Sequence, residues 1–273
     1  MFNRHMFRRA VILGTGMLGG SVALALKKHG LAAQVVGVSR QEASLKTAKE
    51  MKAIDEGTTD IHKAIQGADL VVLAAPVKVI LENIGDISKH LRRGCIVTDV
   101  GSTKAAIVEA AEKQFPPHVM FVGSHPMAGS EKSGMAEARA DLFKDAVCIM
   151  TPTPKTNRMV RDKIKQVWTI MGAQVKVMEP VAHDEIMAYV SHLPHIMAVA
   201  LARSIPEEHV QHGAASLKDT TRIAGSSAQM WADICSSNSR NVTKAIDEAV
   251  KALSDIRKAV VDRDQEALVQ FFN

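Results

Sequence analysis

The N-terminal half of the chain alternates apolar runs with amphipathic stretches, and this alternation predicts strands and helices in turn. Apolar runs of strand length lie at 7–13, 34–39, 69–75, 95–100, 119–122 and 146–150. Helical spacing of apolar positions is found between them, at 17–29, 44–53 and 103–113. Continuous apolar strands that alternate with helices are typical of a parallel sheet covered on both faces. The pattern therefore predicts a doubly wound, Rossmann-type α/β domain over residues 1–180.

The pattern changes after Pro180, where the runs of strand length stop. Apolar residues now recur at helical spacing, at Ile186, Val190, Ile196, Met197 and Ala200. Pro194 lies within this stretch and lacks a backbone donor, so we expect a kink or a break in the helix there. Residues 181–273 are predicted to form an all-helical second domain. Its apolar positions exceed what a thin appended layer needs, which predicts a homodimer joined through this domain.

Composition and charge narrow the classes of function. The chain has 34 basic and 29 acidic residues, no dense cationic run, and only 4% aromatic residues. A nucleic-acid groove usually combines clustered cations with stacking rings, so we expect no nucleic acid; the net charge of +5 suits small anionic substrates. Three widely spaced cysteines form no disulfide framework. The longest apolar run, 70–77, is far shorter than a membrane span, so we expect a cytoplasmic protein without membrane contact.

A glycine pattern ends the first predicted strand and opens the first predicted helix. It reads Gly14-Thr15-Gly16-Met17-Leu18-Gly19, and in this context GxGxxG is a dinucleotide-binding fingerprint. Gly14 permits a tight turn, Gly16 lets the backbone approach a pyrophosphate, and Gly19 lets helix and strand pack closely. The N-terminus of the helix offers N–H groups to the phosphates. The alternative is a glycine-rich turn without a ligand.

The end of the second predicted strand bears on the choice of cofactor. NAD sites usually place a carboxylate about 20 residues beyond the glycines, to hold the ribose hydroxyls. Here the chain reads Ser39-Arg40, with no carboxylate to repel a 2′-phosphate and a guanidinium to pair with it. We therefore expect NADP as the preferred cofactor, with NAD as the alternative. In the competing interpretation Arg40 is a solvated residue or stacks on adenine. Ala75 and Pro76, at the end of a later strand, are expected to line the same cofactor site.

Candidate catalytic residues follow two other predicted strands. His125 lies in the segment 123–131, which we expect to form a loop at the carboxyl edge of the sheet, where ligands of such folds bind. A histidine there can take a proton from an alcohol while a hydride leaves the same carbon. Ser102 ends a neighbouring strand; it is expected to cap the next helix, and a capping residue beside a cleft can also bond to a ligand or to His125. The competing interpretation makes His125 a structural or surface residue.

The helical half adds more polar residues. His192 and His195 share a helix face, but neither cysteine nor HExxH accompanies them, so we expect an anion site rather than a metal site. Arg222 can bind a carboxylate through two hydrogen bonds, and Asp219 is placed to orient it. The alternative for this last pair is a surface ion pair.

These motifs resemble the prephenate/arogenate dehydrogenase family of tyrosine biosynthesis. The resemblance rests on GTGMLGGSVA, DVGSTK, GSHPMAGSE, SHLPH and KDTTRIAG, which occur in the family's order over nearly the whole chain. GSHPMAGSE is much more specific than the glycine fingerprint. A reductase of the β-hydroxyacid or pyrroline-carboxylate type does not need this segment. A non-enzymatic NADP-binding sensor would leave His125 and Arg222 without a role.

The resemblance implies a reaction and roles for the residues. A hydride leaves C4 of the cyclohexadienyl ring for the nicotinamide, the C4 hydroxyl loses its proton, and the ring carboxylate departs as carbon dioxide. The family's roles assign His125 to the hydroxyl proton, Ser102 to the support of His125 and the nicotinamide end, and Arg222 and His195 to substrate carboxylates. Further pocket residues are Ser130, Glu131, His192 and, from the neighbouring subunit, Trp231.

The same resemblance leaves the substrate open. Prephenate and arogenate differ by a side-chain ketone against an amino acid group, and Glu131 could meet the ammonium of arogenate or lie elsewhere in the pocket. We expect a helical domain that dimerises, and neither an appended mutase nor a tyrosine-sensing domain.

Overall fold

The computed structural model describes residues 5–129 and 132–273. Contacts divide the chain into two compact units that are not contiguous in sequence. The first unit contains the residues up to Asp184 together with Ser226–Ser237, and the second contains Glu185–Gly225 together with Asn238–Asn273.

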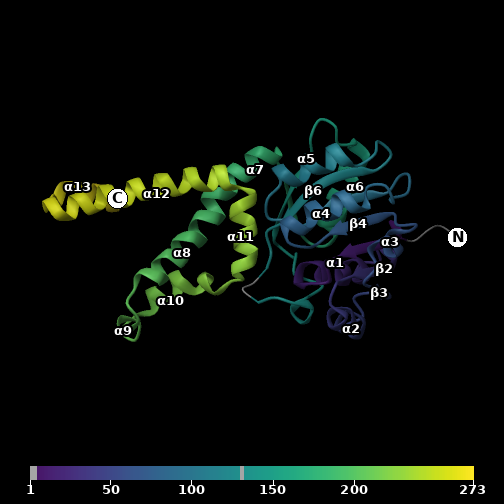
Figure 1. The fold of residues 1–273 in the computed structure, drawn as a ribbon, viewed down its shortest axis with the longest axis horizontal. Helices are drawn as coiled ribbons and strands as arrows, with labels where there is room; N and C mark the ends of the chain where they lie inside the picture. Colours follow the sequence, from purple (N-terminus) through teal and green to yellow (C-terminus); the bar gives the residue numbers. More distant parts are fainter. Residues whose placement is uncertain (1–4, 130–131) are drawn as a thin grey trace. The chain divides into compact units, whose positions relative to one another are not determined.

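The first unit is built on an eight-stranded sheet in the order β3-β2-β1-β4-β5-β6-β7-β8 (Figure 1). The strands are β1 (Phe7–Leu13), β2 (Ala32–Val38), β3 (Glu56–Thr58), β4 (Leu70–Leu73), β5 (Ile96–Asp99), β6 (Met120–Pro126), β7 (Val147–Thr151) and β8 (Gln174–Val177). Strands β1 to β6 are parallel, as predicted. The prediction is wrong for β7, which runs antiparallel to β6. Strand β8, which the pattern did not predict, runs parallel to β7.

The reversal at β7 follows from its connection. A parallel neighbour needs a long crossover, usually through an α-helix. The described residues between β6 and β7 contain only a short 3₁₀ helix, η1 (Met135–Glu137), and the chain returns beside β6 in the opposite direction.

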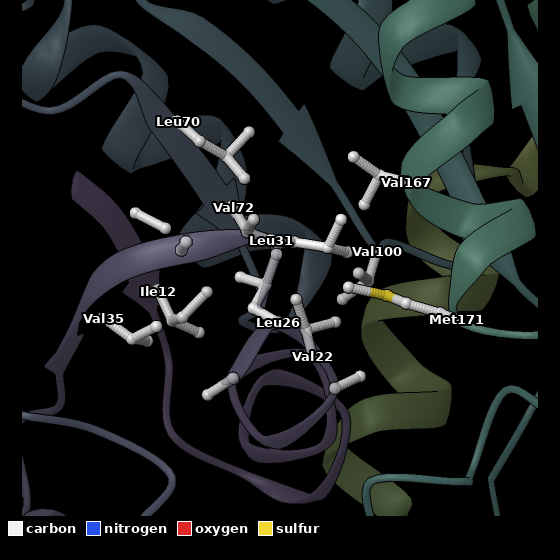
Figure 2. Close-up of a cluster of buried hydrophobic side chains, with 14 of the residues drawn as sticks. Ile12, Val22, Leu26, Leu31, Val35, Leu70, Val72, Val100, Val167 and Met171 are labelled. Carbon is white, nitrogen blue, oxygen red and sulfur yellow. The ribbon is translucent and has the colours of Figure 1, made fainter. Parts of the chain in front are cut away.

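Helices cover both faces of this sheet, and alternate strand residues point into two separate cores. The first core includes residues of α1 (Met17–Lys28), α2 (Glu42–Glu50) and α6 (Arg158–Ile170). The second includes residues of α3 (Ile61–Ile65), α4 (Val77–Ile87) and α5 (Ala105–Gln114). Figure 2 shows part of the first core, where Ile12 and Val72 of the strands lie among Val22 and Leu26 of α1. The neighbouring strand residues Val11 and Val71 belong to the other core, as a sheet buried on both faces requires.

Beyond β8 the described chain is helical, as predicted. The elements are α7 (Pro180–Met187), the π-helix η2 (Ala188–His192), α8 (Leu193–Ser204), α9 (Glu207–Val210), α10 (Ala215–Thr221), the 3₁₀ helix η3 (Arg222–Gly225), α11 (Ala228–Ser237), α12 (Ser239–Asp262) and α13 (Gln265–Phe272). Within the second unit, α8 packs on α10 and η3, and α12 packs on η2 and α13. Helices α8 and α12 diverge from the end at which η2 lies (Figure 1).

Pro194 neither breaks the helix nor leaves it regular. A continuous helix runs from Pro180 to Ser204, and its π-helical turn at Ala188–His192 ends two residues before the proline. Proline lacks an N–H and its ring collides with the carbonyl four residues earlier in a regular α-helix. The wider π turn gives the ring room at that carbonyl, which belongs to Val190. The chain therefore absorbs the proline as a local change of pitch.

The same helix modifies the expectation about membrane contact. It is 25 residues long and contains an 18-residue window with a mean hydropathy of 1.2, so by length and composition alone it could cross a membrane. The expectation of no membrane contact rested on the longest uninterrupted apolar run of the chain, 70–77, and such a run does not reveal an apolar helix that polar residues interrupt. Val190 is 60% exposed and Ile186 is 43% exposed, so the helix presents an apolar face in the single chain. Such a face is also what an interface between subunits would cover.

Candidate active site

The glycine turn between β1 and α1 has the geometry expected of a dinucleotide-binding loop. Gly14 has a φ of +107°, and a Cβ there would lie 2.2 Å from the carbonyl oxygen of Ala74, so only glycine fits. A Cβ on Gly19 would lie 1.9 Å from the carbonyl oxygen of Gly14, so this glycine allows α1 to approach the turn. A Cβ on Gly16 would meet nothing within 4 Å. Gly16 therefore borders open space, where a ligand can approach the backbone.

A cavity of about 320 Å³ opens beside this turn, at the carboxyl ends of β1, β4 and β5. The strand order reverses between β1 and β4, and such a switch point is where open α/β sheets bind ligands. Its walls combine the predicted residues Gly16, Met17, Leu18, Ala75, Pro76 and Ser102 with Ser226, Ser227, Met230 and Ile234 from residues 226–237 of the same unit. The structure thus brings together six predicted residues from three separate segments of the chain: the glycine turn with the start of α1, the end of β4, and the segment after β5.

Thr15 of the glycine turn differs in its surroundings from Ser39 and Arg40, the two residues predicted to bind the adenosine ribose. Thr15 is buried, and its hydroxyl lies 2.9 Å from the hydroxyl of Ser44, so this side chain ties the turn to α2. The Ser39 hydroxyl accepts a hydrogen bond from the Gln41 amide at 3.1 Å. Arg40 is exposed at the end of β2. Its guanidinium is therefore accessible to a phosphate.

His125 does not lie in a loop, as the sequence analysis expected, but on strand β6. This strand continues past Val122 because its last residues, Gly123 to Pro126, pair with the antiparallel strand β7. His125 Nδ1 lies 2.9 Å from His183 Nε2, and His183 Nδ1 lies 2.8 Å from a carboxylate oxygen of Asp184. His183 and Asp184 belong to α7 and are buried, whereas His125 is partly exposed.

Asp184 also provides the cap of helix α5. Its two carboxylate oxygens accept hydrogen bonds from the backbone amides of Lys104 and Ala105, at 2.7 and 2.9 Å. The expectation that Ser102 caps this helix is therefore wrong, because the helix begins at Ala105 and the acceptor comes from α7. Ser102 lines the cavity instead, and the structure gives no hydrogen bond between Ser102 and His125.

A buried ion pair between Lys104 and Asp99 holds the backbone of β6 next to His125. The Lys104 ammonium, fully buried, donates to Asp99 of β5 and, at 2.9 Å, to the carbonyl of Ser124, which directly precedes His125. Burial lowers the pKa of Lys104, and the charge of Asp99 opposes this shift. The second carboxylate oxygen of Asp99 accepts from the Ser124 amide at 3.1 Å. Both polar groups of the Ser124 backbone are thereby held, which fixes the position of the next residue.

The remaining predicted residues lie on other elements. In the second unit, His192 and His195 are buried on η2 and α8, and burial lowers the pKa of His195. Arg222 begins η3, which packs on α8, so the segment carrying Arg222 lies against the helix of His195. Asp219 is exposed on α10, and the structure gives no ion pair between it and Arg222.

Trp231 lies on α11, in the first unit. Ser130 and Glu131 lie outside the described residues.

The sequence analysis missed His183, Asp184 and Lys104. His-Asp is a common dipeptide on a polar helix face, and nothing local shows that it meets β6 and α5. The one available signal was the high polarity of the segment His183-Asp184-Glu185 in an otherwise apolar helix. Buried polar residues of this kind are partnered in native structures, so they were candidates for a long-range contact.

Comparison with known proteins agrees with this architecture. Residues 22–177 match the family model "Prephenate dehydrogenase, nucleotide-binding domain", and residues 179–273 match "Prephenate dehydrogenase, dimerization domain". The first match begins after Gly19, so the assignment of the glycine turn rests on its geometry and position. The second match includes the apolar helix Pro180–Ser204.

Individual relatives cover almost the whole chain. Prephenate dehydrogenase of Bacillus subtilis is 32% identical over 96% of this chain and 72% of its own length. The structure of prephenate dehydrogenase from Aquifex aeolicus in complex with hydroxyphenyl propionate and NAD+ has a TM-score of 0.89 and 35% identity, covering 97% of this chain and 94% of that one. Synechocystis arogenate dehydrogenase has a TM-score of 0.81 and 26% identity, covering 97% and 96%.

The two family models together cover both halves of the chain, and the relatives extend over both. This decides against the other two-domain reductases and against a sensor without enzymatic activity. The chain belongs to the prephenate dehydrogenase family of NAD-dependent oxidoreductases, whose prephenate and arogenate dehydrogenase activity serves tyrosine biosynthesis.

Proposed function

We propose that this chain oxidatively decarboxylates prephenate to 4-hydroxyphenylpyruvate, or arogenate to tyrosine, and that it prefers NADP to NAD. The observation that carries the proposal is the cavity in which the glycine turn, the end of β4 and Ser102 meet. Its residues suit a dinucleotide: Gly16 faces open space, and Gly14 and Gly19 are positions where a side chain would collide with backbone. A pyrophosphate would be held by the backbone of residues 14–19, and a nicotinamide by Ala75, Pro76 and Ser102.

The bound nicotinamide would supply the hydride acceptor, and the chain's own residues handle the proton. His125 takes the proton of the C4 hydroxyl as the hydride leaves C4, and returns it to the phenolate oxygen after carbon dioxide has left. Ser102 donates to the reacting hydroxyl or to the nicotinamide amide, in keeping with its position on the cavity wall. Proton transfer to a positioned base accounts for about 10²–10⁴-fold of a rate enhancement.

The substrate carboxylates are assigned to the helical half. Prephenate carries two carboxylates, and Arg222 offers a planar pair of donors for one of them. His195, on the helix against which η3 packs, is assigned to the same group or to the second carboxylate. His192, Asp219, Ser130, Glu131 and, from a second copy of the chain, Trp231 complete the proposed pocket. We propose no metal in this site.

The proposed function also includes assignments of domains, oligomeric state and cellular location. We propose residues 1–180 as the dinucleotide-binding segment and 181–273 as the helical dimerisation and substrate segment, and a homodimer as the working state. We place the enzyme in the cytoplasm, without a nucleic-acid or membrane partner. The described cysteines support a reducing compartment, since Cys95, Cys148 and Cys235 are all free thiols.

Steady-state kinetics with both substrates and both cofactors test the proposal. Production of NADPH or NADH, followed at 340 nm, should require prephenate or arogenate, and the ratio of the two kcat/KM values identifies the substrate. His125→Asn should retain cofactor binding while turnover falls about 10²–10⁴-fold. A wild-type protein inactive with both substrates would overturn the function, and a folded His125→Asn variant with near-normal turnover would remove His125 from it.

A further inference from the structure

The residues behind His125 form a continuous hydrogen-bonded series that ends on a helix N-terminus. His125 contacts His183, His183 contacts Asp184, and Asp184 accepts the first amides of α5. His183 is 0% exposed and Asp184 is 2% exposed, so water does not screen the interactions between them. We propose that His183 and Asp184 are positioning residues that orient the ring of His125, fix its tautomer and stabilise its protonated form during catalysis. This inference rests on the proposed role of His125 as the base.

The tautomers follow from which atoms can donate. A carboxylate only accepts, so the hydrogen between His183 and Asp184 belongs to His183 Nδ1. His183 Nε2 is then an acceptor in the neutral ring, and the hydrogen between the two histidines belongs to His125 Nδ1. His125 Nε2 consequently carries no hydrogen and is the basic atom of its ring. A substrate hydroxyl can therefore be deprotonated at Nε2 without rearrangement of the histidine.

The charges around the series favour the same arrangement. When His125 takes a proton at Nε2, the imidazolium keeps its charge and is stabilised by its hydrogen bond to His183 Nε2, and His183 is in turn polarised by the Asp184 carboxylate. The first two amides of α5 donate hydrogen bonds to this carboxylate, and the Lys104 ammonium adds a positive charge near it. Lys104 is itself paired with Asp99 of β5, so Asp184 is the anion that faces His183. Cys148 of β7 interacts with the backbone of His125, and burial raises the pKa of this thiol, so it adds no negative charge beside the strand.

The first test is the pH dependence of kcat/KM in Asp184→Asn. Loss of the negative charge disfavours the imidazolium form of His125, so the acid limb should move to lower pH by about one unit. The plateau should fall about tenfold. Asn157→Ala is the matched control, because Asn157 caps α6 in the same unit and accepts from the amides of Met159 and Val160. It removes a helix cap elsewhere, and its acid limb should stay within about 0.2 pH units of wild type, or roughly 0.3 kcal/mol.

Two variants at position 183 distinguish the role of His183 as a hydrogen-bond acceptor from its role in filling space. His183→Leu removes the acceptor for His125 Nδ1–H, and kcat should fall about 100-fold, within the range for a mispositioned base. His183→Gln retains a carbonyl acceptor, and its kcat should exceed that of His183→Leu by about tenfold. Equal kcat values in the two variants, with both proteins folded, would contradict the proposed acceptor role.

Histidine NMR tests the tautomer without any turnover. In protein labelled with ¹⁵N-histidine, two-bond proton–nitrogen correlations above pH 8 should show His125 protonated at Nδ1 and bare at Nε2, with the signals assigned by their loss in His125→Asn. His183→Leu should change this pattern. A His125 ring protonated at Nε2, or an Asp184→Asn acid limb that coincides with wild type, would overturn the inference. An inactive wild type with the expected tautomer would instead refute only the proposed function.

Discussion

At the scale of single residues, the proposed preference for NADP depends on Ser39 and Arg40, which follow β2. A carboxylate there would bond to the NAD hydroxyls and repel the 2′-phosphate of NADP. Ser39 is neutral and Arg40 is exposed, so the guanidinium can reach a phosphate. The related Aquifex structure contains NAD+, so our proposal of NADP rests on this residue pair alone.

The double variant Ser39→Asp/Arg40→Ala should shift the preference towards NAD. Screening at this exposed position limits the effect to about 1–3 kcal/mol, or roughly 5- to 150-fold in the ratio of dissociation constants. Fluorescence titration with both cofactors measures this ratio, and added salt should weaken NADP binding more than NAD binding. If wild-type protein binds NAD at least as tightly as NADP at low salt, Arg40 is not a phosphate ligand.

Arg222 offers a second residue-level test. If its guanidinium holds a substrate carboxylate, Arg222→Ala should raise KM about 10- to 100-fold while kcat changes less, as expected for charge-assisted hydrogen bonds. Lys218→Ala is a suitable control, because it removes the same charge from an exposed position on neighbouring α10. A loss of thermal stability with unchanged KM would identify Arg222 as a structural residue.

Residues were predictable where their role depends on their own neighbours in sequence. Gly14 and Gly19 were identified because a tight turn between a strand and a helix leaves a local signature. His183 and Asp184 were not, because their role depends on contact with β6 and α5, about 58 and 79 residues away along the chain. Spacing alone carries no information about such contacts.

At the scale of elements, two glycines of the turn between β1 and α1 should have different roles, one in stability and the other in cofactor binding. Gly14→Ala should lower the free energy of unfolding by about 1–3 kcal/mol, since its Cβ would collide with the Ala74 backbone. Gly16→Ala should leave stability nearly unchanged, because its Cβ meets nothing, but should raise the dissociation constant for the dinucleotide. Chemical denaturation and cofactor titration of both variants measure the two effects. Unchanged affinity in Gly16→Ala would place the pyrophosphate elsewhere.

Buried strands were predicted better than edge strands for a physical reason. β4 and β5 are apolar throughout because both of their faces are covered, and their positions were predicted within two residues. β3 and β8 were missed, because β3 is three residues long and β8 is largely exposed at the other edge of the sheet. The direction of β7 was also not predictable, since direction is set by the connection and not by the strand's own residues.

At the scale of the whole molecule, the helical half presents apolar side chains that the single chain does not bury. On α12, Val250, Leu253, Val260 and Val261 are each at least 52% exposed, and Phe272 of α13 is 78% exposed. The chain matches a dimerisation domain over this region, so a second copy is the expected cover.

Leu253→Glu combined with Val260→Glu should convert a dimer into a monomer at micromolar concentration, because each carboxylate would have to be buried at an apolar interface. Light scattering measures the mass directly. Met159→Glu is the control, since Met159 is 81% exposed on α6 of the other unit and should leave the mass unchanged. A monomeric wild type would contradict the proposed homodimer.

The first compact unit includes α11, a helix that lies late in the sequence and is synthesised after most of the second unit's shorter helices. Ser226–Ser237 rejoins the unit that the residues up to Asp184 began, and four of its side chains line the cavity at the glycine turn. No single cut in the chain therefore yields two intact units, and a fragment ending near residue 180 would have an unfinished cavity wall. During synthesis the cavity can close only after the first helices of the second unit have been made. Swapping the dinucleotide-binding part between relatives would accordingly require two exchanged segments rather than one.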